Sequence, residues 1–177
     1  MGIIISKEYF KLEELSAEAQ ERAYYEWLDR REYPWAKDNE DSLCAFAELF
    51  GVKITGYGYG GGARPYLRYE PLERDGYRLK GVRLWKFLVR RYAKAIEKEC
   101  PFTGYCMDEV LLDPIRRFLE RPKQDTSLRV LIEESLHSWL HACEKDHEEW
   151  FSWEAFEQEA EELNMVFSAD GGEIVYI

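Results

Sequence analysis

Apolar residues recur every three or four positions in six stretches of the chain, which is the period of an amphipathic α-helix. Ser16 and Ser152 stand just before two of these stretches, where a hydroxyl can accept a hydrogen bond from an exposed backbone amide and start the helix. Pro114 falls inside the fourth stretch and indicates either a break or a late start. The predicted helices cover about residues 16–33, 38–50, 84–98, 107–119, 128–151 and 152–163.

Between these stretches, shorter segments change to a pattern typical of strands. Residues 52–59 and 66–70 flank a glycine-rich turn, and residues 165–168 and 173–177 flank Ala169-Asp170-Gly171-Gly172, so each pair predicts a β-hairpin. Two short segments near the N-terminus, Ile3–Ile5 and Tyr9–Leu12, also read as extended. We therefore predict a single α+β domain over residues 1–177, in which one small antiparallel sheet packs against five or six helices.

Composition supports a folded chain and gives a first expectation of its location. Of the 177 residues, 46% are hydrophobic and 15% aromatic, which argues against disorder. We expect no membrane span, because no segment has the roughly 20 consecutive apolar residues needed to cross a bilayer. We expect the cytoplasm, because the N-terminus lacks the features of a secretory signal and the four cysteines do not form a disulfide framework.

Charge is distributed unevenly, although the net value is −11. Residues 64–98 carry 11 basic and 4 acidic side chains, whereas residues 144–177 carry 1 basic and 11 acidic. An uneven charge distribution of this kind affects which partners the protein attracts and how fast they associate, rather than the fold. The acidic block is also typical of a solvated helix face, so its composition alone does not establish a binding site.

Two candidate interaction surfaces follow from this distribution. The acidic side chains recur about once per helical turn, so they could line up like phosphates and occupy a protein groove that normally receives nucleic acid. The basic segment is a weaker candidate for nucleic acid or a second partner, because its cations could also pair with the acidic residues of the same chain. The acidic candidates are Glu144, Asp146, Glu148, Glu149, Glu154, Glu157, Glu159, Glu161 and Glu162, and the basic candidates are Arg83, Lys86, Arg90, Arg91 and Lys94.

Catalytic and metal-binding motifs are weak. His137 and His141 share a helix face with Glu144 and Glu148, but the order His-Glu-x-x-His of a zinc protease is missing. The glycine-rich segment lacks the Gly-Lys-Ser/Thr ending of a phosphate-binding loop, and no Cys-x-x-Cys occurs. We therefore predict no catalytic residues, no cofactor and no enzyme activity, and keep metal binding at His137 and His141 as an alternative.

Five segments in order along the chain resemble a family of small proteins encoded by tailed phages and prophages, some of which carry an antitoxin-like label. The segments are KLEELSAEAQERA, LFGVKITGYGYGGG, TGYCMD, WLHACEKDHEEWFSWEAF and MVFSADGGEI. The chain departs from the family in its markedly basic middle segment. None of the five segments is a catalytic signature.

The resemblance implies a protein that acts in the bacterial cytoplasm during phage infection. The leading hypothesis is an anti-defence protein, similar to anti-CRISPR inhibitors, that binds a host nucleic-acid-binding defence complex through its acidic surface. One alternative is an antitoxin that neutralises a basic toxin, and another is a metal-dependent enzyme that uses the His137/His141 face. The oligomeric state is left open.

Overall fold

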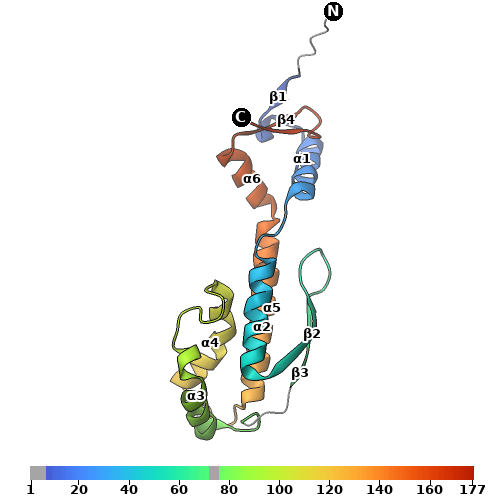
Figure 1. Ribbon diagram of the computed structural model, residues 1–177. Helices are drawn as coiled ribbons and strands as arrows, with labels where there is room; N and C mark the ends of the chain where they lie inside the picture. Colours follow the sequence, from blue (N-terminus) through green and yellow to red (C-terminus); the bar gives the residue numbers. More distant parts are fainter. Residues whose placement is uncertain (1–6, 72–75) are drawn as a thin grey trace, which may run out of the picture. The chain divides into compact units, whose positions relative to one another are not determined.

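The computed structural model describes residues 7–71 and 76–177, and in these residues it contains six α-helices, a short 3-10 helix and five strands (Figure 1). The predicted α+β class is confirmed. The contacts group the described residues into two compact units: unit 1 comprises residues up to 33 together with 148–177, and unit 2 comprises residues 34–147. The prediction of one domain over the whole chain stays a prediction, and each unit is described by itself.

Unit 1 joins the two ends of the described chain through a three-stranded antiparallel sheet. The strand order is β1-β4-β5, with Phe10 opposite Phe167 and Phe167 opposite Ile174. The last turn of α5 also belongs to this unit. Its other elements are β1 (Tyr9–Phe10), η1 (Leu12–Glu14), α1 (Ala17–Arg30), α6 (Trp153–Glu162), β4 (Met165–Ser168) and β5 (Ile174–Tyr176).

The two predicted serine caps start the helices of unit 1. The hydroxyl of Ser16 accepts a hydrogen bond from the backbone amide of Ala19 at 3.3 Å, and that of Ser152 accepts one from Ala155 at 3.1 Å. Both helices then turn their apolar sides toward the sheet. The buried core that results contains Leu15, Ala19, Ala23, Trp27, Phe156, Ala160, Met165, Phe167 and Ile174.

The hairpin between β4 and β5 rests directly on α1, and this contact requires a glycine. Gly171 has a φ of 74°, and a Cβ atom there would lie 1.9 Å from the carbonyl oxygen of Ala19. Beside it, the carboxylate of Asp170 accepts a hydrogen bond from the guanidinium of Arg22 at 2.7 Å. The segment MVFSADGGEI therefore packs against KLEELSAEAQERA, although the two lie at opposite ends of the sequence.

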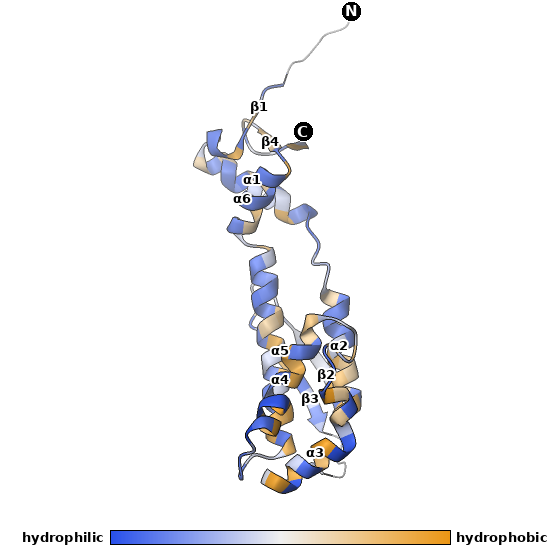
Figure 2. Cartoon of the chain, turned by 90° about the vertical axis from the view of Figure 1, so that its left-hand side faces the viewer, coloured by the Kyte–Doolittle hydropathy of each residue, from blue (hydrophilic) through white to orange (hydrophobic). Residues whose placement is uncertain are grey.

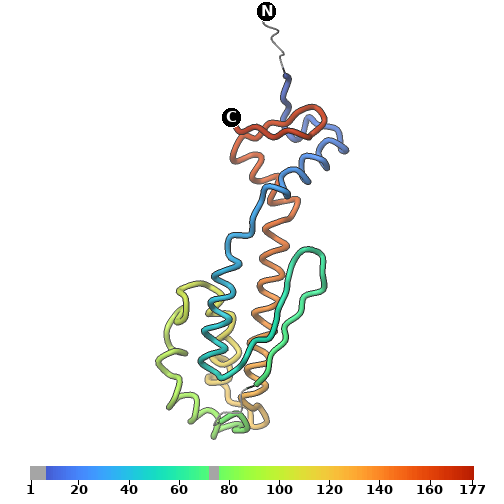
Figure 3. Tube along the Cα trace, turned by 45° about the vertical axis from the view of Figure 1, so that its right-hand side comes forward, coloured from blue at the N-terminus to red at the C-terminus, as the bar shows by residue number. Residues whose placement is uncertain are grey.

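Unit 2 consists of four helices and a separate β-hairpin. The helices are α2 (Ala36–Phe50), α3 (Gly81–Ile96), α4 (Cys106–Glu120) and α5 (Leu128–Trp150), the last of which belongs to unit 2 as far as residue 147. Strands β2 (Val52–Gly58) and β3 (Tyr66–Pro71) pair antiparallel and extend beside α5 into a long glycine-rich loop (Figure 3). Hydrophobic residues alternate with hydrophilic ones along the helices (Figure 2), and the buried core includes Leu43, Phe46, Leu84, Leu88, Leu111, Ile115, Ile132, Leu136 and Trp139.

Two details differ from the sequence predictions, and one prediction is not tested. The strands form two sheets rather than one, because the inner side chains of the β2–β3 hairpin, such as Ile54 and Tyr69, pack on the helices of unit 2. Helix α4 continues through Pro114, which is buried inside it, so neither a break nor a late start occurs. The strand expected at Ile3–Ile5 lies outside the described residues.

Among the residues that the structure describes, no helix has the length and apolar character needed to cross a membrane. The longest helix, α5, carries polar and charged side chains at regular intervals. Its buried side chains, among them Leu136 and Trp139, instead contribute to the core of unit 2.

Candidate functional site

Four of the predicted acidic residues share one exposed face of α6. Glu154, Glu157, Glu161 and Glu162 are all exposed, and their spacing places them along a single stripe of the helix. The opposite side of α6 holds Phe156, which is fully buried in the core of unit 1. We call these four glutamates the α6 acidic face. The sequence alone could not establish this convergence.

Glu159 lies on the same helix but points inward. Its carboxylate pairs with the guanidinium of Arg31, and the two side chains are 27% and 13% exposed. Arg31 also lies over the rings of Trp27 and Trp150, at 4.3 and 3.7 Å from their centroids, and donates to the carbonyl of Trp150 at 3.1 Å. Glu159 therefore has a structural role within unit 1, and we leave it out of the candidate surface.

The remaining acidic candidates lie on α5, on either side of the division between the units. Glu148 and Glu149 are exposed and belong to unit 1, whereas Glu144 and Asp146 are partly buried in unit 2. Glu144 has a neighbour in its own helix, because its carboxylate lies 3.9 Å from Nδ1 of His141. The predicted set of nine therefore does not form one surface within either unit.

The negative charge of the chain is concentrated in unit 1. Its sequence ranges contain 17 acidic and 5 basic side chains, a balance of −12, whereas those of unit 2 contain 18 acidic and 19 basic, a balance of +1. The net charge of −11 therefore conceals one strongly acidic unit and one nearly neutral unit. Local potential, rather than net charge, determines what each unit can attract.

The predicted basic residues form an exposed stripe on α3. All five are exposed, and none of them forms an ion pair with another described residue. The proposed pairing of these cations with acidic groups of the same chain is therefore not seen in the described part. The stripe residues are Arg83, Lys86, Arg90, Arg91 and Lys94.

Aromatic side chains near this stripe face the protein interior. Trp85 donates from Nε1 to the carbonyl of Leu119 at 3.0 Å, and Tyr92 is buried against Phe50. A surface that stacks nucleic-acid bases needs exposed rings beside its cations. None of the aromatic side chains of α3 is exposed, although Arg91 lies 5.8 Å from the half-buried ring of Phe87, and this weakens the nucleic-acid interpretation.

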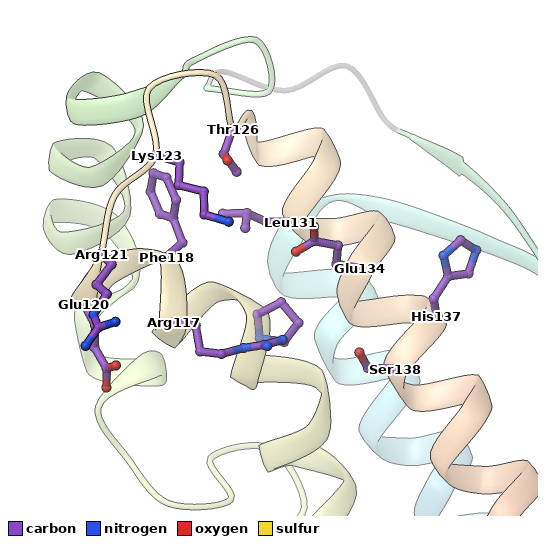
Figure 4. A pocket seen from close by; sticks show the side chains of 11 residues that line it. Arg117, Phe118, Glu120, Arg121, Lys123, Thr126, Leu131, Glu134, His137 and Ser138 are labelled. Atoms are coloured by element: carbon purple, nitrogen blue, oxygen red, sulfur yellow. The ribbon is translucent and has the colours of Figure 1, made fainter.

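A pocket of about 640 Å³ lies between α4 and α5 in unit 2 (Figure 4). Its lining mixes charges of both signs, with Arg117, Arg121 and Lys123 against Glu120 and Glu134. The guanidinium of Arg117 already pairs with a carboxylate of its own helix at 2.9 Å. Such a lining has no clear preference for an anion or a cation.

The histidine candidates do not gather with other metal ligands. His137 is exposed at the edge of the pocket between α4 and α5, and His141 is 81% exposed. No group of three or more histidine, cysteine or carboxylate side chains that could hold a metal occurs among the described residues. His147 instead packs edge-on against Tyr59, with ring centroids 6.2 Å apart.

The turn between α3 and α4 is organised by a buried carboxylate that the sequence did not reveal. Asp108 is fully buried, and its Oδ2 atom accepts hydrogen bonds from the backbone amides of Phe102 and Thr103, both at 2.8 Å. Thr103 also donates from its hydroxyl to Oδ1 at 3.1 Å. The available signal was an acidic residue in the first turn of a predicted helix, which does not by itself distinguish an exposed carboxylate from a buried one.

A second carboxylate, Glu109, holds the same turn from the other side. It accepts from the backbone amide of Cys100 at 2.7 Å and pairs with the guanidinium of Arg116, and these bonds lower the pKa of Glu109. Burial raises the pKa of the Cys100 thiol, so this thiol stays protonated at neutral pH. The turn has the contacts of a structural element.

Several tyrosines near the core of unit 2 are also held in the neutral form. Burial raises the pKa of Tyr57 and of Tyr59 to about 12. The hydroxyl of Tyr59 accepts from the side-chain amide of Asn39 at 3.2 Å, and Trp139 donates to the carbonyl of Asn39 at 3.1 Å. This network ties the hairpin to α2 and α5.

Comparison with protein-family models, with curated proteins and with solved structures finds no match to this chain. Among the predicted site residues, the four glutamates of the α6 acidic face are the acidic group that the fold brings together on one exposed surface.

Proposed function

We propose that this protein is a binding protein whose α6 acidic face occupies the cationic surface of a nucleic-acid-binding protein of a host defence complex. The observation that supports the proposal is the stripe formed by Glu154, Glu157, Glu161 and Glu162 on one exposed helix face. Successive turns of an α-helix rise by about 5.4 Å, so the stripe presents carboxylates at short, regular intervals.

Physical chemistry favours a fast, salt-dependent association for such a surface. An acidic face on a unit with a balance of −12 attracts a cationic groove over long range and raises the association rate. Exposed ion pairs contribute only about 0.2 to 1 kcal/mol each, so the face needs several of them to act together. Inhibition would then follow from occupancy and would require no catalytic step.

The resemblance to phage-encoded proteins supports the choice of target class and of the bacterial cytoplasm. A phage protein of this kind meets the nucleic-acid-binding complexes of the host defence, whose grooves are cationic. An acidic surface would suit a small basic toxin equally well, so the antitoxin alternative is retained as an outcome of the same experiment.

The test is capture of a partner from a bacterial host lysate with the full chain as bait. The expected partner binds nucleic acid, and added DNA or RNA should release it from the bait. Replacing Glu154, Glu157 and Glu161 by Lys should abolish capture.

A matched control replaces three exposed carboxylates of unit 2 by Lys, which changes the net charge by the same amount. Glu97, Glu99 and Asp125 serve this purpose. Equal loss of capture in both variants would show that net charge, not the α6 acidic face, controls binding. Capture of a basic protein that nucleic acid does not compete for would replace the proposal with the antitoxin alternative.

A further inference from the structure

Two glutamates of the α6 acidic face also form the edge of a groove in unit 1. Glu157 and Glu161 line this groove, whose volume is about 910 Å³. It runs between α6, the segment around η1 and the strand β4, all of which belong to unit 1. Glu154 and Glu162 do not line it. The acidic face is therefore divided into residues beside the groove and residues away from it.

Part of the lining of the groove is apolar, and we call this part its floor. Leu12 from η1, Val166 from β4 and Ala160 from α6 contribute to it, and all three are buried or half-buried. Ile177 continues the apolar lining and is 82% exposed. An apolar side chain exposed to this degree beside a groove is a site where a partner's apolar group can be buried.

The charged part of the lining, which we call the rim, is predominantly acidic. Glu13, Glu157 and Glu161 lie on it, against the single cation Lys11. Gln20 also lines the groove, but its side-chain amide already donates to the carbonyls of Leu12 and Leu15. The charges available to a partner are therefore mainly carboxylates.

We propose that this groove docks a basic amphipathic segment of the protein partner, with aliphatic side chains on the floor and Lys or Arg side chains against Glu157 and Glu161. Charge complementarity and the apolar floor select this occupant together. The inference rests on the proposed function, because it specifies which part of the partner the α6 acidic face receives.

Other occupants fit the groove less well. The phosphates of a nucleic acid would be repelled by the acidic rim, and an acidic peptide would be repelled for the same reason. A purely polar cationic segment would pair with the rim but leave the apolar floor exposed. A volume of about 910 Å³ corresponds to a usual ligand site and accommodates several aliphatic side chains.

Three synthetic helical peptides of equal length test the chemistry of the occupant with the full chain. One peptide combines lysine and leucine, the second combines lysine and serine at the same charge, and the third combines glutamate and leucine. Fluorescence anisotropy should show the lysine–leucine peptide binding at least about tenfold more tightly than the lysine–serine peptide, because burial of even one leucine is worth that factor. The glutamate–leucine peptide should not bind.

Two pairs of substitutions test the location on α6. Glu157→Gln with Glu161→Gln removes two charges beside the groove, and Glu154→Gln with Glu162→Gln removes two charges of the same helix face away from it. The first pair should weaken the lysine–leucine peptide about fivefold and the second less than about twofold, because exposed ion pairs act at short range.

A second comparison tests the floor. Ile177→Ser should weaken the lysine–leucine peptide about fivefold, whereas Leu163→Ser should change its affinity less than about twofold. Leu163 is the matched control, since it is 47% exposed in the same unit but does not line the groove. Circular dichroism should show that all four variants are folded, as the altered side chains are exposed.

Equal binding of the lysine–leucine and lysine–serine peptides would overturn the inference, as would equal effects of the two glutamine pairs. In either case the partner would recognise charge alone. The proposed function would stand if replacing Glu154, Glu157 and Glu161 by Lys still abolished capture. If the peptides behave as expected but the captured partner does not bind nucleic acid, the groove stands and the proposed function fails.

Discussion

Glu157 and Glu159 lie two residues apart on α6, yet the structure gives them opposite surroundings. Glu157 belongs to the exposed acidic face, whereas Glu159 pairs with Arg31, which lies between the rings of Trp27 and Trp150. Replacing each glutamate by glutamine removes the same negative charge and nearly the same volume. The two variants should therefore differ only through what the carboxylate contacts.

The expected magnitudes follow from burial. In Glu159→Gln the guanidinium of Arg31, only 13% exposed, loses its carboxylate. A hydrogen bond to a charged group contributes about 1.5 to 3 kcal/mol, and we expect a loss of that size in the free energy of unfolding. Glu157→Gln should change it by less than about 0.5 kcal/mol, or raise it slightly, because unit 1 carries a balance of −12 and is relieved of one repelling charge.

Urea denaturation followed by tryptophan fluorescence measures the difference, since Trp27 and Trp150 contact the side chain of Arg31. Arg31→Lys provides a further comparison, because lysine keeps the charge but loses the planar contact with the two rings. It should be destabilised, though less than Arg31→Met. If Glu159→Gln and Glu157→Gln had the same midpoint, the ion pair would make no net contribution and the assignment of separate roles would be wrong.

Three further predictions concern contacts inside one unit or the other. Asp108→Ala should lower the free energy of unfolding by about 3 to 5 kcal/mol, because several backbone amides lose a buried acceptor; urea titration measures it. Gly171→Ala should lower the free energy of unfolding by more than about 3 kcal/mol, because the new Cβ would collide with the carbonyl of Ala19. Gly61→Ala is the control in the same assay: it has open space around it and should lower this free energy by only about 1 kcal/mol, through backbone strain. Because the pKa of Glu109 is lowered in the folded protein, its ionised carboxylate stabilises the fold above the ordinary value of 4.5, and this stabilisation is lost as the pH falls through the lower folded value. The urea midpoint of Glu109→Gln should therefore fall less steeply in acid than that of the unchanged protein.

Much of the secondary structure could be predicted because its signals are local. The serine caps at Ser16 and Ser152, the left-handed Gly51 that ends α2 and the helical period of apolar residues are each contained in a few neighbouring positions. Pro114 misled the prediction because its cost in a helix depends on tertiary packing, and here Pro114 is a buried residue inside α4. The division of the strands into two sheets depends on long-range contacts, which a single sequence does not display.

The candidate site could be predicted only in part from the sequence, for the same reason. The sequence contained every acidic residue of α6, but only the folded unit separates Glu159, which has a partner in Arg31, from Glu157, which is exposed. The groove was missed entirely, because its lining comes from residues near 12, 160 and 177. No local pattern joins positions so far apart.

The position of each carboxylate, rather than their number, therefore determines what the acidic unit can recognise. A partner that responds only to the balance of −12 would be indifferent to which glutamate is replaced, since every replacement changes that balance equally. A partner that docks in the groove must distinguish Glu157 and Glu161, beside an apolar floor, from Glu154 and Glu162, which have none. Attraction between opposite charges brings either partner close to the acidic unit. A surface that binds only phosphates gains nothing from an apolar floor, whereas a protein segment can bury its aliphatic side chains there. Affinity for aliphatic side chains therefore distinguishes a protein-docking groove from simple imitation of nucleic acid.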